Sequence, residues 1–206
     1  MTLVVGDDGV ARCPWGDHPE LRDYHDLEWG VTVRDDQHLF ERMTLEAFQS
    51  GLSWLIIFRK RDRFREVFAD FDAKVVAEFG PGEVETLMAD AGIVRNRAKI
   101  LATIKNAQAI ADLDVPLSDL LWGFAPTDHV RPATLGEMRA TTPESVALAK
   151  ELKKRGFAFV GPTTAYALMQ ATGMVNDHLV GCEASAAGEN RLLLGQEGLD
   201  GDEVVG

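Results

Sequence analysis

The chain has 206 residues, of which 46% are hydrophobic and two are cysteines. This length allows one domain or two small helical lobes with a real core, and no apolar run approaches the ~20 residues that cross a membrane. Two cysteines exclude a disulfide framework. The polar start of the chain, with Asp7 and Asp8, is unlike a signal peptide, so we expect a cytoplasmic protein.

Charge is unevenly distributed along the chain. The net charge of −12 argues against DNA as a partner when it is taken as a single number. Basic residues nevertheless gather in three clusters, at residues 59–65, 95–99 and 150–155. Each cluster alone is typical of a solvated helix face. DNA affinity depends on local phosphate neutralisation, so the net charge does not exclude DNA binding.

Helical periodicity runs through most of the chain. From Asp35, apolar residues between Leu39 and Phe48 recur on one face of a helix. Capping residues, first-turn prolines and closing glycines predict further helices at residues 53–68, 73–79, 81–91, 95–113, 143–154 and 162–172. Residues 113–142 are the least regular, and no period-2 pattern predicts a strand, so we expect an all-α fold.

Two cysteines and two histidines form a pattern that suits a metal. Cys13 precedes His25 by a spacing of C-x11-H, and His178 and Cys182 form an i,i+4 pair that faces one way on a helix. Four such ligands favour tetrahedral zinc and leave no open position, which makes a structural site. The alternative is two buried thiols and two unrelated histidines, because the first spacing is not that of a standard zinc finger.

A glycine-containing turn joins the last two predicted helices. It spans residues 156–161 and follows Lys153 and Lys154. A turn that leads into a helix N-terminus offers free backbone N–H groups to a phosphate, and the lysines add charge beside it. The alternative is an ordinary corner between two packed helices.

Aromatic residues accompany a carboxylate within the first 54 residues of the chain. Glu46 lies on the predicted helix after Asp35, and the aromatic residues are Trp15, Tyr24, Trp29 and Trp54. A lone aromatic residue is usually part of a core. A carboxylate among several aromatic rings, by contrast, makes a pocket suited to a flipped nucleobase.

Together and in this order, these features resemble the 3-methyladenine DNA glycosylase I family of the helix–hairpin–helix DNA glycosylase superfamily. The similarity extends from Arg12 to Cys182, through the segments 12–15, 24–30, 45–54, 90–93, 153–161 and 175–182. It implies an all-α, helix–hairpin–helix glycosylase-like fold in which a structural zinc site joins the N- and C-terminal segments. The implied organisation is an N-terminal tail at 1–12, a glycosylase domain at 13–182 and an acidic, mobile tail at 183–206.

The resemblance also implies base-excision repair of alkylated double-stranded DNA. The enzyme would flip out N3-methyladenine and hydrolyse its N-glycosidic bond, leaving an abasic site. The implied catalytic residues are Glu46 and Tyr24. The implied base-binding residues are Trp15, Tyr24, Glu46 and Trp54. The implied DNA contacts, with Leu52 as the wedge, are Gly51, Leu52, Lys153, Lys154, Gly156 and Gly161. The implied ligands of one structural zinc ion per chain are Cys13, His25, His178 and Cys182.

Comparison with the superfamily refines this expectation. Bifunctional members use a hairpin lysine as a nucleophile, and Thr163 stands at that position, so we predict a monofunctional enzyme without a lyase step. Asn176 aligns with the aspartate that supports the sugar in many members. Leu21 replaces an aromatic residue that family members often carry, which changes one pocket wall. We expect a bacterial cytoplasmic monomer without a membrane partner, associated with the nucleoid when it is bound to DNA.

Two other classes of function fit parts of the pattern. A non-catalytic, zinc-stapled DNA-binding module would keep the hairpin but need not keep Glu46, Tyr24 and Trp54 together. A zinc nuclease or deaminase would need an open coordination position, and deaminases carry H-x-E with P-C-x-x-C motifs. Neither deaminase motif occurs in the sequence, so the residues favour the glycosylase.

Overall fold

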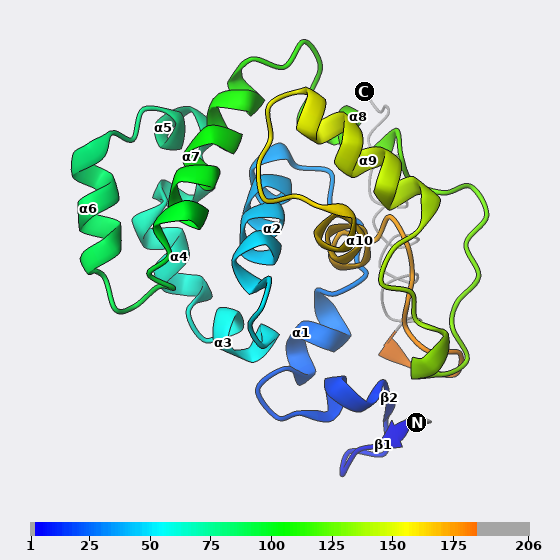
Figure 1. Ribbon diagram of the computed structural model, residues 1–206. Coiled ribbons are helices and arrows are strands. Elements are labelled where there is room, and N and C mark those ends of the chain that lie inside the picture. The colour runs from blue at the N-terminus through cyan, green and yellow to red at the C-terminus, as the bar shows by residue number, and fades with distance from the viewer. Residues whose placement is uncertain (1–2, 185–206) are drawn as a thin grey trace, which may run out of the picture. The chain divides into compact units, whose positions relative to one another are not determined.

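The computed structural model describes residues 3–184 and is mostly helical (Figure 1). It divides into two compact units, each assembled from segments far apart in the sequence. Among the described residues, the first unit contains 3–31, 129–138 and 176–184, and the second contains 32–128 and 139–175. The predicted acidic tail lies, from residue 185 onward, outside the described residues.

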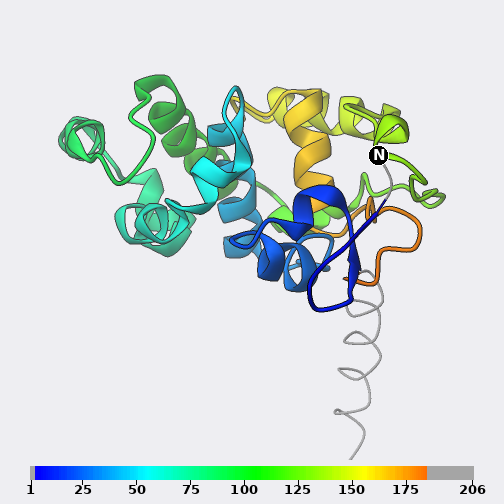
Figure 2. The same ribbon diagram turned by 90° about the horizontal axis from the view of Figure 1, so that it is seen from below.

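The first unit contains short elements only. They are β1 (Val4–Val5), β2 (Ala11–Arg12), η1 (Pro14–Asp17), α1 (Arg22–Leu27) and η3 (Leu135–Glu137). The strands pair antiparallel within the segment predicted as an N-terminal tail. The expectation that the chain has no strand is therefore wrong here, because two-residue strands are too short to show a period-2 pattern. Figure 2 shows the N-terminal segment beside residues 176–184, and the amide of Glu183 donates to the carbonyl of Ala11 at 2.9 Å.

The second unit contains the longer helices. They are α2 (Asp36–Gln49), α3 (Trp54–Phe58), α4 (Arg61–Val67), η2 (Ala69–Phe71), α5 (Ala73–Ala77), α6 (Pro81–Ala89), α7 (Arg97–Ala111), α8 (Leu117–Trp122), α9 (Pro143–Lys154) and α10 (Pro162–Ala171). Local signals explain several starts. The Asp35 carboxylate accepts the His38 amide, and Thr142 and Ser145 cap each other's backbone at the start of α9.

Helix α2 lies at the centre of the second unit. It packs against α7, α8 and α10, and Leu39, Phe40, Met43 and Phe48 on it are fully buried. Phe48 also meets Phe64 of α4, with 4.7 Å between the ring centroids. Burying aromatic rings of this size contributes several kcal/mol to a core. The helix that carries Glu46 is therefore held rigidly on several sides.

The prediction of a single helix over residues 53–68 is wrong. The structure has α3 and α4 there, separated at Arg59 and Lys60. The Lys60 amide bonds the carbonyl three residues back, on Ile57, and its ammonium group donates to the carbonyl of Ala91 at 2.7 Å. This tertiary contact holds the break between the two helices. Elsewhere, α8 forms within the segment expected to be irregular.

The length and the apolar content of each helix decide whether it could cross a membrane. None of the helices in residues 3–184 combines the length and the apolar character that a membrane span requires.

Candidate functional site

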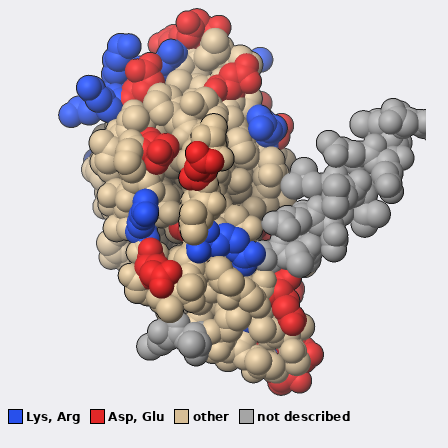
Figure 3. Space-filling view, turned by 90° about the vertical axis from the view of Figure 1, so that its right-hand side faces the viewer, with Lys and Arg blue, Asp and Glu red and all other residues tan. Residues whose placement is uncertain are grey.

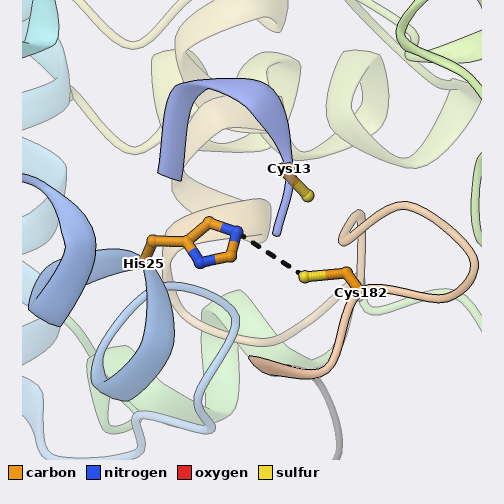
Figure 4. A group of neighbouring side chains, drawn as sticks. All are labelled: Cys13, His25 and Cys182. Atoms are coloured by element: carbon orange, nitrogen blue, oxygen red, sulfur yellow. Dashed lines mark hydrogen bonds between the residues drawn. The ribbon is translucent and has the colours of Figure 1, made fainter. Parts of the chain in front are cut away.

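Three of the four predicted metal ligands meet in the first unit (Figure 4). Cys13 precedes η1, His25 lies on α1, and Cys182 lies in the C-terminal segment 176–184. We refer to these three residues as the Cys–His group. Their ligand atoms all lie within 4.8 Å of one another, and all three residues are buried. His25 Nε2 and Cys182 Sγ are 3.7 Å apart. Zinc bonds of this kind separate tetrahedral ligand atoms by roughly 3.5–3.8 Å, so the donor set fits zinc.

The fourth predicted ligand, His178, lies beside this group and not within it. Its ring centroid is 4.9 Å from that of His25. Its Nε2 lies 3.3 Å from the His25 carbonyl oxygen, and its Nδ1 lies 3.1 Å from Asn176 Oδ1. The structure therefore brings three sulfur and nitrogen donors together and places the second imidazole next to them, with its ring nitrogens directed at other oxygens.

A second layer of contacts orients the group. The Asp26 carboxylate lies 2.7 Å from His25 Nδ1 and also accepts the buried Arg12 guanidinium at 2.7 Å. A carboxylate on one ring nitrogen fixes the tautomer that leaves the other free to bind a metal. The Leu179 amide donates to Cys13 Sγ at 3.3 Å. Neither Arg12 nor Asp26 was predicted, although both lie beside predicted ligands in the sequence.

The two thiols share one hydrogen bond. Donation from Cys13 lowers the pKa of Cys182 well below its usual range, and His25 lowers it further, against an opposing effect of burial. The same bond, together with burial, raises the pKa of Cys13. A thiolate beside an imidazole is the donor chemistry that zinc prefers.

Two glycines make room for the imidazole rings. A β-carbon at Gly16 would overlap the ring of His25. At Gly30, where φ is +76°, a β-carbon would lie 2.9 Å from His178 Cε1. These glycines carry no signal in the sequence, because only the packed rings show why a side chain is excluded there.

The aromatic residues of the first unit lie next to the Cys–His group. The Trp15 ring is 6.3 Å from that of Tyr24, 4.7 Å from that of His25 and 5.0 Å from that of Trp29, measured between centroids. Tyr24 and Trp29 are buried, and Trp15 is half-buried. Two of the predicted base-binding residues, Trp15 and Tyr24, are thus neighbours on η1 and α1.

The other two predicted base-binding residues belong to the second unit. Glu46 lies in the last turn of α2, and Trp54 begins α3 after the short turn at residues 50–53. Glu46 is only 7% exposed. Burial raises the pKa of its carboxyl group from 4.5 to about 7, against an opposing effect of the Arg42 charge. A buried carboxyl group with a raised pKa is suited to a ligand that brings positive charge, because that charge stabilises the ionised form.

The predicted DNA-contacting residues lie at two turns of the second unit, with Lys153 and Lys154 in the last helical turn of α9. In the first turn, Gly51 has φ +82° and Leu52 is 36% exposed. In the second, between α9 and α10, Gly156 has φ +93° and the exposed Phe159 has φ +59°. Positive φ favours glycine, so both glycine positions have a backbone reason for their identity.

The basic clusters are less free than the sequence suggests. Arg65 pairs with the buried Glu41 at 2.8 Å, and Arg155 pairs with Asp114 at 2.8 Å. Lys154 is exposed and lies 3.5 Å from Glu151. Figure 3 shows basic and acidic side chains interspersed on one face of the molecule. Because Arg155 is half-buried and paired, the exposed basic residues nearest the hairpin in the sequence are Lys153 and Lys154.

Comparisons with known proteins agree with this helical architecture, which is that of a DNA glycosylase. A family model described as methyladenine glycosylase matches residues 15–185. The DNA-3-methyladenine glycosylase 1 of Escherichia coli is 45% identical, over 84% of this chain and 96% of its own length. The DNA-3-methyladenine glycosylase of Haemophilus influenzae is 43% identical, over 84% of this chain and 97% of its own length.

Solved structures agree with the sequence relatives. A crystal structure of 3-methyladenine DNA glycosylase I matches with a TM-score of 0.80 at 43% identity, over 84% of this chain and 98% of that one. The enzyme from Staphylococcus aureus, whose structure addresses 3-methyladenine recognition, matches with a TM-score of 0.79 at 30% identity, over 84% and 95%. The chain belongs to the methyladenine glycosylase family. It is an enzyme of the N-glycosyl hydrolase class.

Proposed function

We propose that this chain removes N3-methyladenine from alkylated double-stranded DNA by flipping out the nucleotide and hydrolysing its N-glycosidic bond. The observation that carries the proposal is Glu46, a buried carboxyl group with a pKa of about 7 on the central helix of the second unit. The relatives named for 3-methyladenine support the choice of base. We further propose that one copy of the chain acts alone.

The charge of the damaged base explains the use of a lone carboxylate. Alkylation at N3 makes the nucleobase cationic, and a cation beside Glu46 favours its ionised form and lowers its pKa. The stacking surface proposed for the base in the same unit as Glu46 is Trp54, and the roles of Trp15 and Tyr24 in binding the base stay predictions from the sequence. A cation over an aromatic face gains about 0.5–2 kcal/mol for each good contact. A neutral adenine gains neither the charge interaction nor this stacking advantage.

The same charge lowers the chemical barrier. The bond between the sugar C1′ and the base breaks with its electron pair passing to the cationic base, which leaves neutral. A water oxygen then bonds to C1′ and its proton passes to solvent. Ordinary glycoside hydrolysis needs an acid to protonate the leaving group and a second carboxylate opposite, but a leaving group that is already cationic does not need the acid.

Two turns are proposed to hold the DNA. Leu52, exposed after Gly51, would fill the gap left by the flipped nucleotide, as apolar wedges do in other kinked duplexes. The hairpin between α9 and α10, with Lys153, Lys154, Gly156 and Gly161, would hold a phosphate at the start of α10. Thr163 stands at the position of the Schiff-base lysine in bifunctional enzymes, which supports a monofunctional reaction.

The proposed zinc has a structural role. Cys13, His25 and Cys182 are supported as ligands by their spacing and burial, and His178 would complete the set by turning one ring nitrogen toward it. Bound zinc would supply a clip between segments of the first unit that are more than 150 residues apart in the chain. Four protein ligands leave no open position for substrate, so no catalytic step is assigned to the metal.

A base-release assay tests the proposal. Alkylated duplex DNA is incubated with the enzyme, and the released bases are separated by chromatography. We expect 3-methyladenine to be the main product, with abasic sites left in strands that stay intact until they are treated with alkali. Release of no alkylated base would contradict the proposed reaction. Strand cleavage without alkali would contradict its monofunctional form.

A further inference from the structure

A buried lysine caps the helix that carries Glu46. The Lys99 ammonium group on α7 donates to the carbonyl oxygens of Phe48 at 2.8 Å and of Ser50 at 2.7 Å. The last carbonyls of a helix have no partner within it, and a positive charge there complements the helix dipole. Lys99 is only 7% exposed, and burial lowers its pKa. The two hydrogen bonds to carbonyl oxygens offset the cost of burying the ammonium group, and they fix the place where α2 ends.

The Leu52 turn depends on that end. The Leu52 amide donates to the carbonyl of Gln49 at 2.7 Å, and the Gln49 side chain donates back to the Leu52 carbonyl at 3.3 Å. Gln49, the final residue of α2, takes part in both bonds, as acceptor in the first and as donor in the second. Where Leu52 projects is therefore set by the helix end that Lys99 holds.

A second buried polar residue of α7 holds the hairpin. Asn106 is 1% exposed and pairs with Ala158 as a neighbouring strand would. Its side-chain amide donates to the Ala158 carbonyl at 3.1 Å, and its side-chain oxygen accepts the Ala158 amide at 2.7 Å. Ala158 lies in the middle of the turn between α9 and α10. Figure 1 shows this turn passing beside α7.

The two anchors lie on one face of a rigid helix. They are seven residues apart, about two turns and roughly 10.5 Å along the axis. Between them, Ile100 and Ile104 are buried in the core of the second unit. The helix therefore links the Leu52 turn to the hairpin through two sets of hydrogen bonds, each spanning about 50 residues of sequence.

We infer that Lys99 and Asn106 are positioning residues, through which α7 sets the separation between the turn that enters the duplex and the hairpin that holds its backbone. This inference rests on the proposed function, which assigns those roles to the two turns. Lys99 acts on the wedge, so its loss should affect excision from duplex DNA. Asn106 acts on the hairpin, so its loss should affect DNA affinity.

The Lys99 arm compares duplex with single-stranded lesion DNA, in which no gap has to be filled. We expect Lys99→Met to slow single-turnover excision from duplex by roughly 10- to 100-fold, the effect of a misplaced group, and to leave the single-stranded rate unchanged. Lys99→Arg, which keeps donors, should restore most of the duplex rate. Lys105→Met is the matched control, because Lys105 is an exposed lysine on the same helix; it should behave as wild type.

The Asn106 arm measures affinity. Asn106→Asp keeps the size of the side chain but sets a carboxylate against the Ala158 carbonyl. We expect binding to abasic-site duplex to weaken by roughly tenfold, with the excision rate at saturating enzyme unchanged. The matched control is Gln108→Glu, because Gln108 bonds the Ala77 carbonyl at 3.1 Å, away from both turns. It should leave affinity unchanged.

Leu52→Ala separates failure of the inference from failure of the proposed function. It should lower the duplex rate selectively, and Lys99→Met should add little in the double variant. If Leu52→Ala leaves the ratio of duplex to single-stranded rates unchanged, the proposed wedge is wrong. If Leu52→Ala lowers that ratio and Lys99→Met does not, or if Lys99→Met slows both substrates equally, the inference is wrong. Should Lys99→Met fail to fold, faster amide exchange at Leu52 in Lys99→Gln supports the inference and unchanged exchange overturns it.

Discussion

The Cys–His group of the first unit and Glu46 of the second are both buried and titratable, but only the first finds its partners among the residues that the structure describes. His25 has Asp26, Asp26 has Arg12, and Cys13 has Cys182 and the Leu179 amide. Glu46 is left with a pKa of about 7 because burial outweighs the Arg42 charge. Buried polar groups that hydrogen-bond one another, as in the Cys–His group, stabilise the fold. A buried carboxyl group with a raised pKa, such as Glu46, is suited to bind a positively charged ligand.

The same contrast exists within α2 itself. Glu41 and Glu46 are both buried carboxyl-bearing residues on this helix. Glu41 pairs with Arg65 at 2.8 Å, whereas the pKa of Glu46 is raised. The pair therefore offers a structural carboxylate and a functional one on the same helix.

The largest expected effect is on excision. Glu46→Gln removes the charge that faces the cationic base, so we expect single-turnover release of 3-methyladenine to fall by roughly 100- to 1,000-fold, as when one electrostatic stabiliser is lost. The matched variant Glu41→Gln should excise as wild type but unfold at a lower temperature. Equal excision by Glu46→Gln and wild type would remove Glu46 from the proposed site.

The variant Glu46→Gln, which should lose excision activity, should gain stability at neutral and alkaline pH. The folded pKa of Glu46, about 7, lies above its unfolded value of 4.5, so the folded state binds the extra proton and stability falls as pH rises between these values. Glu46→Gln removes this cost. Above pH 7 we expect its free energy of unfolding to exceed that of wild type by roughly 3 kcal/mol, with the difference vanishing below about pH 4.5. Denaturant unfolding at pH 5 and pH 8 measures it, and a pH-independent difference would contradict the raised pKa.

Crowding the first unit should cost stability. Gly16→Ala places a methyl group against the His25 ring, and overpacking of this kind costs about 1–3 kcal/mol. We expect less bound zinc by elemental analysis and a lower unfolding temperature. Gly82→Ala is the control, since a β-carbon there meets nothing within 4 Å. Full zinc content in Gly16→Ala, or none in wild type, would contradict the metal site.

The aromatic face should contribute by stacking alone. Trp54→Ala should weaken binding of free 3-methyladenine by about 1–3 kcal/mol, the usual value of one base–aromatic stack, and leave binding to abasic-site DNA nearly unchanged. Calorimetric titration with 3-methyladenine and with adenine measures this. Wild type should prefer 3-methyladenine, and Glu46→Gln should lose that preference. An unchanged affinity in Trp54→Ala would place its ring elsewhere than on the base.

The smallest effect is expected from exposed charge. Replacing Lys153 and Lys154 by Glu should weaken binding to abasic-site DNA and reduce its salt dependence, by about 0.9 in logarithmic slope for each phosphate that the variant no longer neutralises. Both changes should be uniform across sequences. If affinity and slope stay as in wild type, the hairpin lysines do not bind DNA.

Local signals were enough to predict much of the helical fold. Thr142 and Pro143 mark the start of α9, and Pro162 marks that of α10, because capping and a fixed φ act within a few residues. The candidate residues could also be named from the sequence, since the order of Cys13, His25, Glu46 and the hairpin resembles the family. These signals depend on the residues themselves and on their immediate neighbours.

Tertiary structure decided what depends on contacts between distant residues. The break between α3 and α4 at Lys60, with its bond to Ala91, could not be read from a continuous helical pattern. The place of His178 beside the other three ligands also depends on packing. Lys99 and Asn106 look like ordinary polar residues of a helix until the carbonyls they hold, about 50 positions away, are known. The raised pKa of Glu46 has the same origin, because the water that a carboxylate loses is displaced by the whole surrounding fold and not by its neighbours in the chain.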